Sequence, residues 1–152
     1  MIHPRKAVAA ALALVLTAST TSAAFADCAA LTAEGLIDKT RILAARDVAA
    51  ADGMPAYCEV EATISPVEGS AIGAVARLPV EWNGKLYAAG GGGFAGDVNL
   101  ETVTPALKRG YATISTDMGH PGTDSLGMEW IIAEKGKLDG IRMADFGYRA
   151  AH

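Results

Sequence analysis

The sequence lacks several patterns that usually identify catalytic and metal-binding proteins. No G-x-S-x-G string occurs in its 152 residues, so the chain does not carry the nucleophile elbow most typical of α/β-hydrolases. The two cysteines form no C-x-x-C pair, and no ligand set with the spacing of a zinc site accompanies them. A redox dithiol and a structural zinc site are therefore excluded, and we expect no metal.

Long apolar segments are also absent, apart from one at the start of the chain. Arg5 and Lys6 precede an apolar stretch from Ala7 to Ala18, and Ala24-Phe25-Ala26 follows as a cleavage site. The stretch is shorter than the roughly 18 to 20 residues that span a bilayer. We expect residues 1–26 to be a cleavable signal peptide. Residues 27–152 would then be secreted or periplasmic, without membrane contact after cleavage.

Basic residues are outnumbered by acidic ones. The formal charge of the whole chain is −4, and it becomes −6 without residues 1–26, which contain Arg5 and Lys6 but no acid. This balance argues against nucleic acid or an anionic membrane as a partner. No repeat or low-complexity linker divides residues 27–152, which we count as one domain or part of one.

The two cysteines, Cys28 and Cys58, both follow the predicted signal and would meet an oxidising compartment. A single disulfide between them is the natural prediction. Closing a loop of this length stabilises a fold by about 3 to 4 kcal/mol. The alternative is that each cysteine pairs with one outside this sequence.

Hydrophobic periodicity predicts an α/β chain. The spacing of Leu36, Ile37, Ile42, Leu43 and Ala44 predicts a helix within residues 28–51. Alternation and β-branched composition predict strands at 57–66, 72–78, 85–89 and 111–116, and apolar spacing predicts helices at 100–108 and from residue 141 onward. Hairpins followed by strand, helix, strand, helix describe part of a mixed sheet.

Four consecutive glycines, Gly90 to Gly93, come directly after the predicted strand at 85–89. Glycine costs about 0.5 to 1 kcal/mol relative to alanine in regular structure, so such a block indicates that bare backbone is required there. One use is to present N–H donors to an oxyanion. A phosphate cradle is a weaker hypothesis because no G-K-[ST] follows. A packed turn without a chemical role is the third alternative.

Asp117 and His120 follow the strand at 111–116, at an edge where open α/β sheets bind ligands. They could act as a general base pair, but two side chains are too few for a zinc site. We favour structural roles, in which they fix the geometry of the strand end.

Other polar and aromatic residues have ordinary interpretations. Ser115 and Ser125 lack an elbow sequence around them and are expected to be sheet or loop hydroxyls. Trp82 and Trp130 are expected to anchor packing. Asp145 and Arg149, four residues apart, predict an ion pair on a helix surface.

Four motifs in order carry a family resemblance: L-P-x-x-W-N-G-K-L at 78–86, GGGGFAG at 90–96, A-L-x-R-G-Y-A-T-x-S-T-D-x-G-H at 106–120 and D-F-G-Y-R-A-x-H at 145–152. Together they resemble the tannase and feruloyl esterase family of secreted α/β-hydrolases. The stretch around Cys28 and from Met54 to Val60 also resembles that family's amino-terminal segment.

The resemblance implies hydrolysis of aromatic carboxylic esters, such as gallates and ferulates, by a Ser-Asp-His triad. In that family the serine lies in a C-S-x-G-G elbow, and a large lid often carries calcium. The resemblance places the elbow, the rest of the triad, the lid and its calcium beyond His152. We therefore assign no triad residue and no cofactor to this chain.

What the resemblance does transfer is the oxyanion loop, with donors at Gly92 and Gly93 and with Gly91 beside them. The expected fold is a partial α/β-hydrolase that lacks the nucleophile elbow and the lid. The expected function is hydrolysis of small aromatic esters once the domain is completed, and the chain alone would be inactive. The alternative is a secreted, non-catalytic binding domain that retains the hydrolase scaffold.

Overall fold

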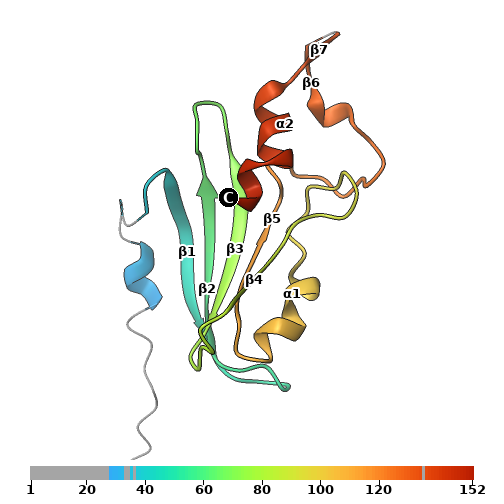
Figure 1. The fold of residues 1–152 in the computed structure, drawn as a ribbon. Coiled ribbons are helices and arrows are strands. Elements are labelled where there is room, and N and C mark those ends of the chain that lie inside the picture. The colour runs from blue at the N-terminus through green and yellow to red at the C-terminus, as the bar shows by residue number, and fades with distance from the viewer. Residues whose placement is uncertain (1–27, 33–34, 36, 135) are drawn as a thin grey trace, which may run out of the picture.

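A computed structural model describes residues 28–152 except 33, 34, 36 and 135, so the predicted signal peptide at 1–26 lies outside the described residues. The chain forms a five-stranded sheet, a helix beside two of its strands, and a second helix with a small hairpin at the other end (Figure 1). The strands are β1 (Thr40–Val48), β2 (Tyr57–Ile64), β3 (Ile72–Pro79), β4 (Leu86–Ala89), β5 (Ala112–Thr116), β6 (Ile132–Glu134) and β7 (Lys137–Leu138); the helices are α1 (Leu100–Leu107) and α2 (Gly140–Gly147), with 3-10 turns η1 (Cys28–Thr32), η2 (Glu129–Ile131) and η3 (Arg149–Ala151).

The sheet is mixed, as the sequence predicted. Its strand order is β1-β2-β3-β5-β4. The pairs β1–β2, β2–β3 and β3–β5 are antiparallel, whereas β4 and β5 are parallel and joined through α1. Asn99 caps α1 by accepting a hydrogen bond from the amide of Thr102, and Val103, Ala106 and Leu107 bury the apolar side of this helix. The partial α/β architecture is therefore confirmed.

The helix predicted within residues 28–51 is wrong. Its described residues form η1 and the nine-residue strand β1. Leu43 is 53% exposed, whereas Ile42 and Ala45 pack against the buried cluster on β2. A bulge between Ile42 and Ala44 breaks the alternation and mimics a helical spacing. Pairing with β2 decides the structure, because it satisfies the backbone along the length of β1.

The predicted disulfide is present. Cys28 and Cys58 are bonded, with their Cα atoms 5.8 Å apart, and both side chains are fully buried. Val60 completes the buried centre, and Leu31 of η1 and Leu78 of β3 pack around it. The bond therefore holds η1 on the sheet face that carries these apolar residues.

Two predictions about which side chains are buried are wrong. Trp82 is 60% exposed and does not anchor the core; its indole N–H donates to the carbonyl oxygen of Lys85 at 2.8 Å. The ion pair between Asp145 and Arg149 exists, at 2.9 Å, but Asp145 is 1% exposed and also accepts a hydrogen bond from Ser70 at 2.7 Å. It is therefore a buried link between α2 and the β2–β3 turn. No helix among the described residues is long and apolar enough to cross a bilayer.

Besides Asp145 on α2, a second charged residue is buried, and it lies on β2. Glu59 is 4% exposed and pairs with Arg77 at 2.7 Å and with Arg46. Its neutralisation would leave the partly buried Arg77 guanidinium without its counter-charge, and breaking a buried pair costs about 3 kcal/mol or more.

We therefore expect Glu59→Gln to lower the free energy of unfolding by about 3 kcal/mol. Glu61→Gln is the matched control, because Glu61 lies on the same strand but its side chain is 43% exposed. Urea denaturation followed by circular dichroism measures both. Equal losses in the two variants would contradict a stabilising role for the buried pair.

Candidate functional site

Two loops meet at one edge of the sheet because β4 and β5 run in parallel. We call residues 90–96, which follow β4, the glycine loop. The segment that follows β5 begins at Asp117 and runs toward η2. The two are bonded directly: Gly96 and Gly122 exchange backbone hydrogen bonds of 2.8 and 3.0 Å, and the Phe94 amide donates to the carbonyl oxygen of Ser125 at 3.0 Å. The second half of the glycine loop is thus held by a neighbouring segment of the chain.

Close packing explains most of the glycines. A Cβ on Gly91 would overlap the carbonyl of Ala95, and one on Gly96 would overlap the carbonyl of His120. Gly93 has φ +63°, and a Cβ there would lie 2.6 Å from the Ser125 carbonyl oxygen. A Cβ on Gly92, in contrast, would meet nothing within 4 Å and would project into open space. Steric exclusion fixes the loop, and Gly92 is its open point.

The amides at the start of the loop are unused. The N–H groups of Phe94, Ala95 and Gly96 donate to carbonyls, including a 3.1 Å bond from Ala95 to Gly92. Within the described residues, the N–H groups of Gly91, Gly92 and Gly93 donate to no acceptor. Gly92 and Gly93 are also exposed. Consecutive free amides in a fixed loop can bind an oxygen that carries negative charge.

Asp117 ties the β5 end to the sheet. One carboxylate oxygen accepts hydrogen bonds from the amides of Gly73 and Gly119, both at 2.8 Å. Met118 and Gly119 both have positive φ, at 57° and 81°. The carboxylate therefore connects β3 to the turn at Met118 and Gly119. It helps to hold Met118 in a left-handed conformation that is unfavourable for an L-residue.

His120 lies beside the glycine loop but is not paired with Asp117. The imidazole is 3% exposed and stacks on Trp130, with ring centroids 3.7 Å apart and an interplanar angle of 2°. Burial lowers the pKa of His120 from 6.5; Asp117 opposes this by raising it, and Arg142 lowers it further. The ring is therefore neutral at pH 7 and is not aligned as a general base for any described hydroxyl.

The candidate hydroxyls are not activated. Ser115 is fully buried, and its Oγ accepts a hydrogen bond from the Asn99 amide at 2.9 Å. No hydrogen bond joins Ser125 Oγ to a base among the described side chains, and Nδ1 of His152 lies 3.0 Å from the carbonyl oxygen of Tyr148. A nucleophile needs a base within hydrogen-bond reach. The residues that the structure describes contain no serine–histidine pair of this kind.

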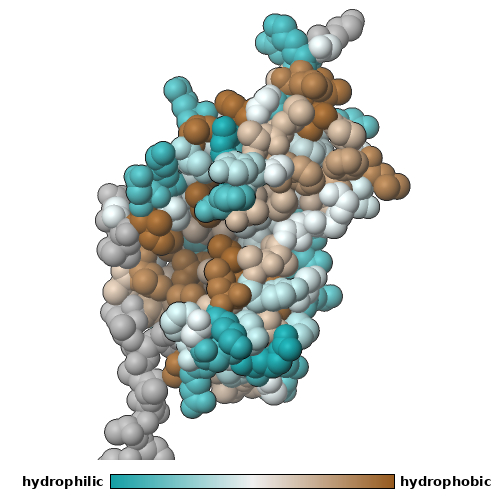
Figure 2. Space-filling view, in the orientation of Figure 1, coloured by the Kyte–Doolittle hydropathy of each residue, from teal (hydrophilic) through white to brown (hydrophobic). Residues whose placement is uncertain are grey.

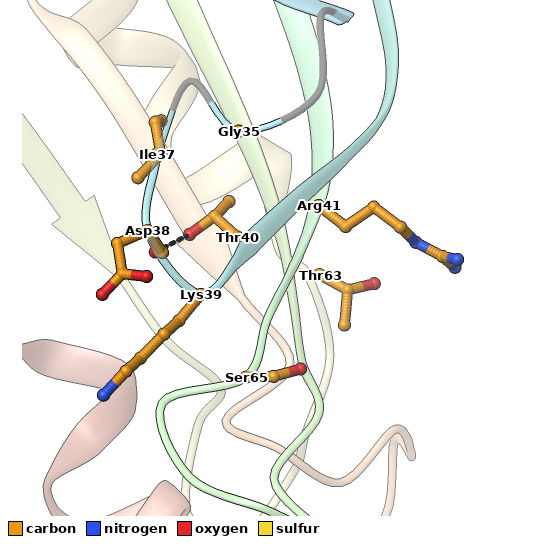
Figure 3. A pocket seen from close by; sticks show the side chains of 8 residues that line it. All are labelled: Gly35, Ile37, Asp38, Lys39, Thr40, Arg41, Thr63 and Ser65. Atoms are coloured by element: carbon orange, nitrogen blue, oxygen red, sulfur yellow. Dashed lines mark hydrogen bonds between the residues drawn. The ribbon is translucent and has the colours of Figure 1, made fainter.

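One cavity lies away from these loops. It measures about 690 Å³ and lies where β1 begins and β2 ends. Figure 3 shows that Lys39 and Arg41 point in opposite directions, and the bond from Thr40 Oγ1 to the Asp38 carbonyl, at 3.2 Å, is local. Because its side chains diverge, we do not assign a binding role to this cavity.

A second cavity is apolar and lies on the open sheet face. It measures about 510 Å³, and its walls include Ile64, Leu86, Ala88, Ile114 and the segment 148–152. Leu86 is 64% exposed on β4, one of the two edge strands of the sheet. Figure 2 shows apolar side chains gathered over the strands in this region. The face opposite α1 is therefore only partly covered.

A glycine loop with free amides, placed after a parallel strand of a mixed sheet, defines this chain as part of an α/β-hydrolase scaffold. The chain belongs to the tannase and feruloyl esterase family, whose family profile matches residues 58–152.

Two relatives agree with this family. The chain is 36% identical to an uncharacterized esterase of Xanthomonas campestris pv. campestris, over 73% of this chain and 20% of that protein. It is 31% identical to the mono(2-hydroxyethyl) terephthalate hydrolase of Piscinibacter sakaiensis, over 70% of this chain and 20% of that protein. The chain thus spans about a fifth of the length of these relatives.

The crystal structure of feruloyl esterase B from Aspergillus oryzae is similar to this fold, with a TM-score of 0.66 and 23% identity; the match covers 81% of this chain and 26% of that one. A tannin acyl hydrolase from Aspergillus niger gives a TM-score of 0.55 at 20% identity, over 77% of this chain and 24% of that one. These likenesses show the fold.

Trp130 packs against His120 and Phe146, as expected for an anchoring tryptophan. The other supports of the loop were not predicted: Phe146 contacts both His120 and Phe94, and the backbone of Gly122 and Ser125 binds the loop. Phe146 lies in the D-F-G-Y-R string, but its target could not be read from that string. Ser125 gave no signal, because its backbone rather than its side chain makes the contact.

We expect Gly93→Ala to destabilise the chain more than Gly92→Ala. A left-handed backbone costs an L-residue about 1 to 2 kcal/mol, and the new methyl group would also press on the Ser125 carbonyl. Gly92→Ala should stay within about 0.5 kcal/mol of the unmodified protein. Thermal unfolding of both variants tests this, and equal melting temperatures would argue against steric control of the loop.

The lowered pKa of His120 predicts a loss of stability in mild acid. A group whose pKa falls on folding binds its proton more readily in the unfolded chain, so its full stabilisation holds above pH 6.5 and declines as the pH falls below 6.5 toward the folded-state pKa. His120→Phe should remove this part of the pH dependence, whereas His152→Asn should retain it. Urea denaturation midpoints of both variants, measured from about pH 7.5 down through pH 6.5 into mild acid, test this prediction. A midpoint that falls equally with pH in both variants would contradict it.

Proposed function

We propose that this chain supplies the oxyanion-binding part of a carboxylic ester hydrolase that acts on small aromatic esters. The observation that carries the proposal is the row of free, accessible amides at Gly91, Gly92 and Gly93. Ester cleavage places negative charge on the former carbonyl oxygen, and one fixed donor aimed at that oxygen contributes about 3 to 4 kcal/mol.

The loop meets the requirement that such donors be fixed before reaction. Backbone bonds from Phe94 to Ser125 and between Gly96 and Gly122 hold its second half, and close packing at Gly91 and Gly93 limits its first half. Donors that do not reorganise as charge develops stabilise the transition state more than the ground state.

Hydrolysis also needs an activated nucleophile, which the described residues do not supply. We propose that a triad outside these residues completes the site and that the chain alone does not turn over esters. The aromatic substrate class is supported by the feruloyl esterases and the terephthalate hydrolase among the relatives. Export through residues 1–26, to the periplasm or the medium, is part of this proposal.

The second candidate is a secreted binding domain without catalysis. The same observation favours it, because free amides can bind a carboxylate with no nucleophile nearby. The two candidates differ in whether a triad completes the site.

We expect ferulate, whose carboxylate stands in for the oxyanion, to shift the amide resonances of Gly91, Gly92 and Gly93 in a ¹⁵N-labelled sample of residues 27–152. Gly92→Val should weaken these shifts, because its side chain enters the open space in front of the amides. Gly140→Ala is the control, since Gly140 is exposed at the start of α2, has open space around it and has no positive φ.

The same sample is assayed with methyl ferulate and methyl gallate. No turnover is expected. Turnover that disappears in Gly92→Val would show a nucleophile within these residues and overturn the proposed division of the site. Shifts confined to other residues would refute anion binding by the loop.

A further inference from the structure

One nitrogen of the His120 imidazole, Nε2, is buried without a hydrogen-bond partner among the described residues. Leaving a buried polar group unpaired costs about 1 to 3 kcal/mol. A phenylalanine could make the same stacking contact without this cost, so stacking alone does not account for a histidine at this position.

His120 belongs to a cluster of rings, centred on Phe146, that joins the glycine loop to α2. We call Phe94, His120, Trp130 and Phe146 the aromatic cluster. The ring centroid of Phe146 lies 5.4 Å from His120, 5.1 Å from Trp130 and 6.1 Å from Phe94. Phe94 belongs to the glycine loop itself and directly follows Gly93. Movement of the imidazole would therefore reach the loop through Phe146 and Phe94.

Charged groups surround the ring from each element packed against it. Asp117 lies at the end of β5, and α2 contributes Arg142 and Asp145; the carboxylate of Asp145 is already held by Ser70 and Arg149. A small cavity of about 190 Å³ borders the ring and is lined also by Asp124, Glu129 and Trp130. Neither Asp124 nor Glu129 pairs with a cation among the described residues.

We propose that His120 is a positioning residue for the glycine loop that works only as a neutral imidazole, and that proton uptake moves its ring out of the aromatic cluster toward Asp124 and Glu129. In the stack, the Nε2–H group of a charged ring would be buried without an acceptor, whereas the cavity offers two carboxylates. Withdrawal of the ring removes the support of Phe146 and Phe94, and the loop loses its fixed geometry in mild acid.

The consequence for ester cleavage rests on the proposed function, but the movement of the loop does not. Loop order can be measured with no ligand present. A failure of anion binding at Gly91 to Gly93 and a failure of the acid response are therefore separate results.

The first measurement follows Trp130 by fluorescence. In a Trp82→Phe variant, Trp130 is the remaining tryptophan of the chain. Its emission should change sigmoidally with pH, with a midpoint below 6.5. The change should vanish in Trp82→Phe/His120→Phe and persist in Trp82→Phe/His152→Asn. An emission that stays constant down to about pH 5 would overturn the proposal, because an imidazole in van der Waals contact must report its charge.

The second measurement follows the loop by amide hydrogen exchange, corrected for the intrinsic effect of pH. Protection of the Phe94 and Gly96 amides should fall about tenfold between about pH 7.5 and a pH below the midpoint of the fluorescence titration in the unmodified chain, and stay constant in His120→Phe. Val60, in the disulfide-linked core, should keep its protection in both proteins. If the Trp130 emission titrates but the exchange protection of Phe94 and Gly96 stays constant, His120 takes up a proton but does not position the loop. Retained near-ultraviolet circular dichroism shows that each variant is folded.

Discussion

The parallel pairing of β4 with β5 is the constraint on which the rest of the site depends. It places the glycine loop and the segment after Asp117 at one edge of the sheet, where Gly96 and Gly122 bond to each other. The crossover through α1 makes this pairing possible, because a parallel partner cannot be reached by a tight turn. Without it, neither the support from Ser125 nor the packing at His120 would exist.

The loop at this edge combines rigidity with unused hydrogen-bonding capacity. Close contacts at Gly91, Gly93 and Gly96 hold the backbone, yet the amides of Gly91, Gly92 and Gly93 have no acceptor among the described residues. Unpaired amides are tolerated here because Gly92 and Gly93 are exposed to water. The same exposure makes them available to a ligand oxygen, which connects the local packing to the proposed role in ester cleavage.

The supporting elements are fixed by separate interactions of different kinds. The disulfide and the pair between Glu59 and Arg77 stabilise the antiparallel hairpins, and Asp117 attaches the β5 end to β3. Asp145 then anchors α2 to the β2–β3 turn through Ser70, which presents the neighbouring Phe146 to the aromatic cluster. Chain segments far apart in sequence thereby hold one loop.

The sequence by itself determined the mixed α/β architecture and the family, because alternation and ordered motifs are local signals. It predicted the pairing of Cys28 with Cys58 but left an alternative open, and the tertiary structure decided it. The sequence did not determine β1, where a bulge imitates helical spacing, or the burial of Asp145. The bonds from Gly122 and Ser125 to the glycine loop and the stack of His120 on Trp130 were decided by the tertiary structure. Backbone contacts and ring packing between distant segments depend on three-dimensional proximity, which no spacing along the chain encodes.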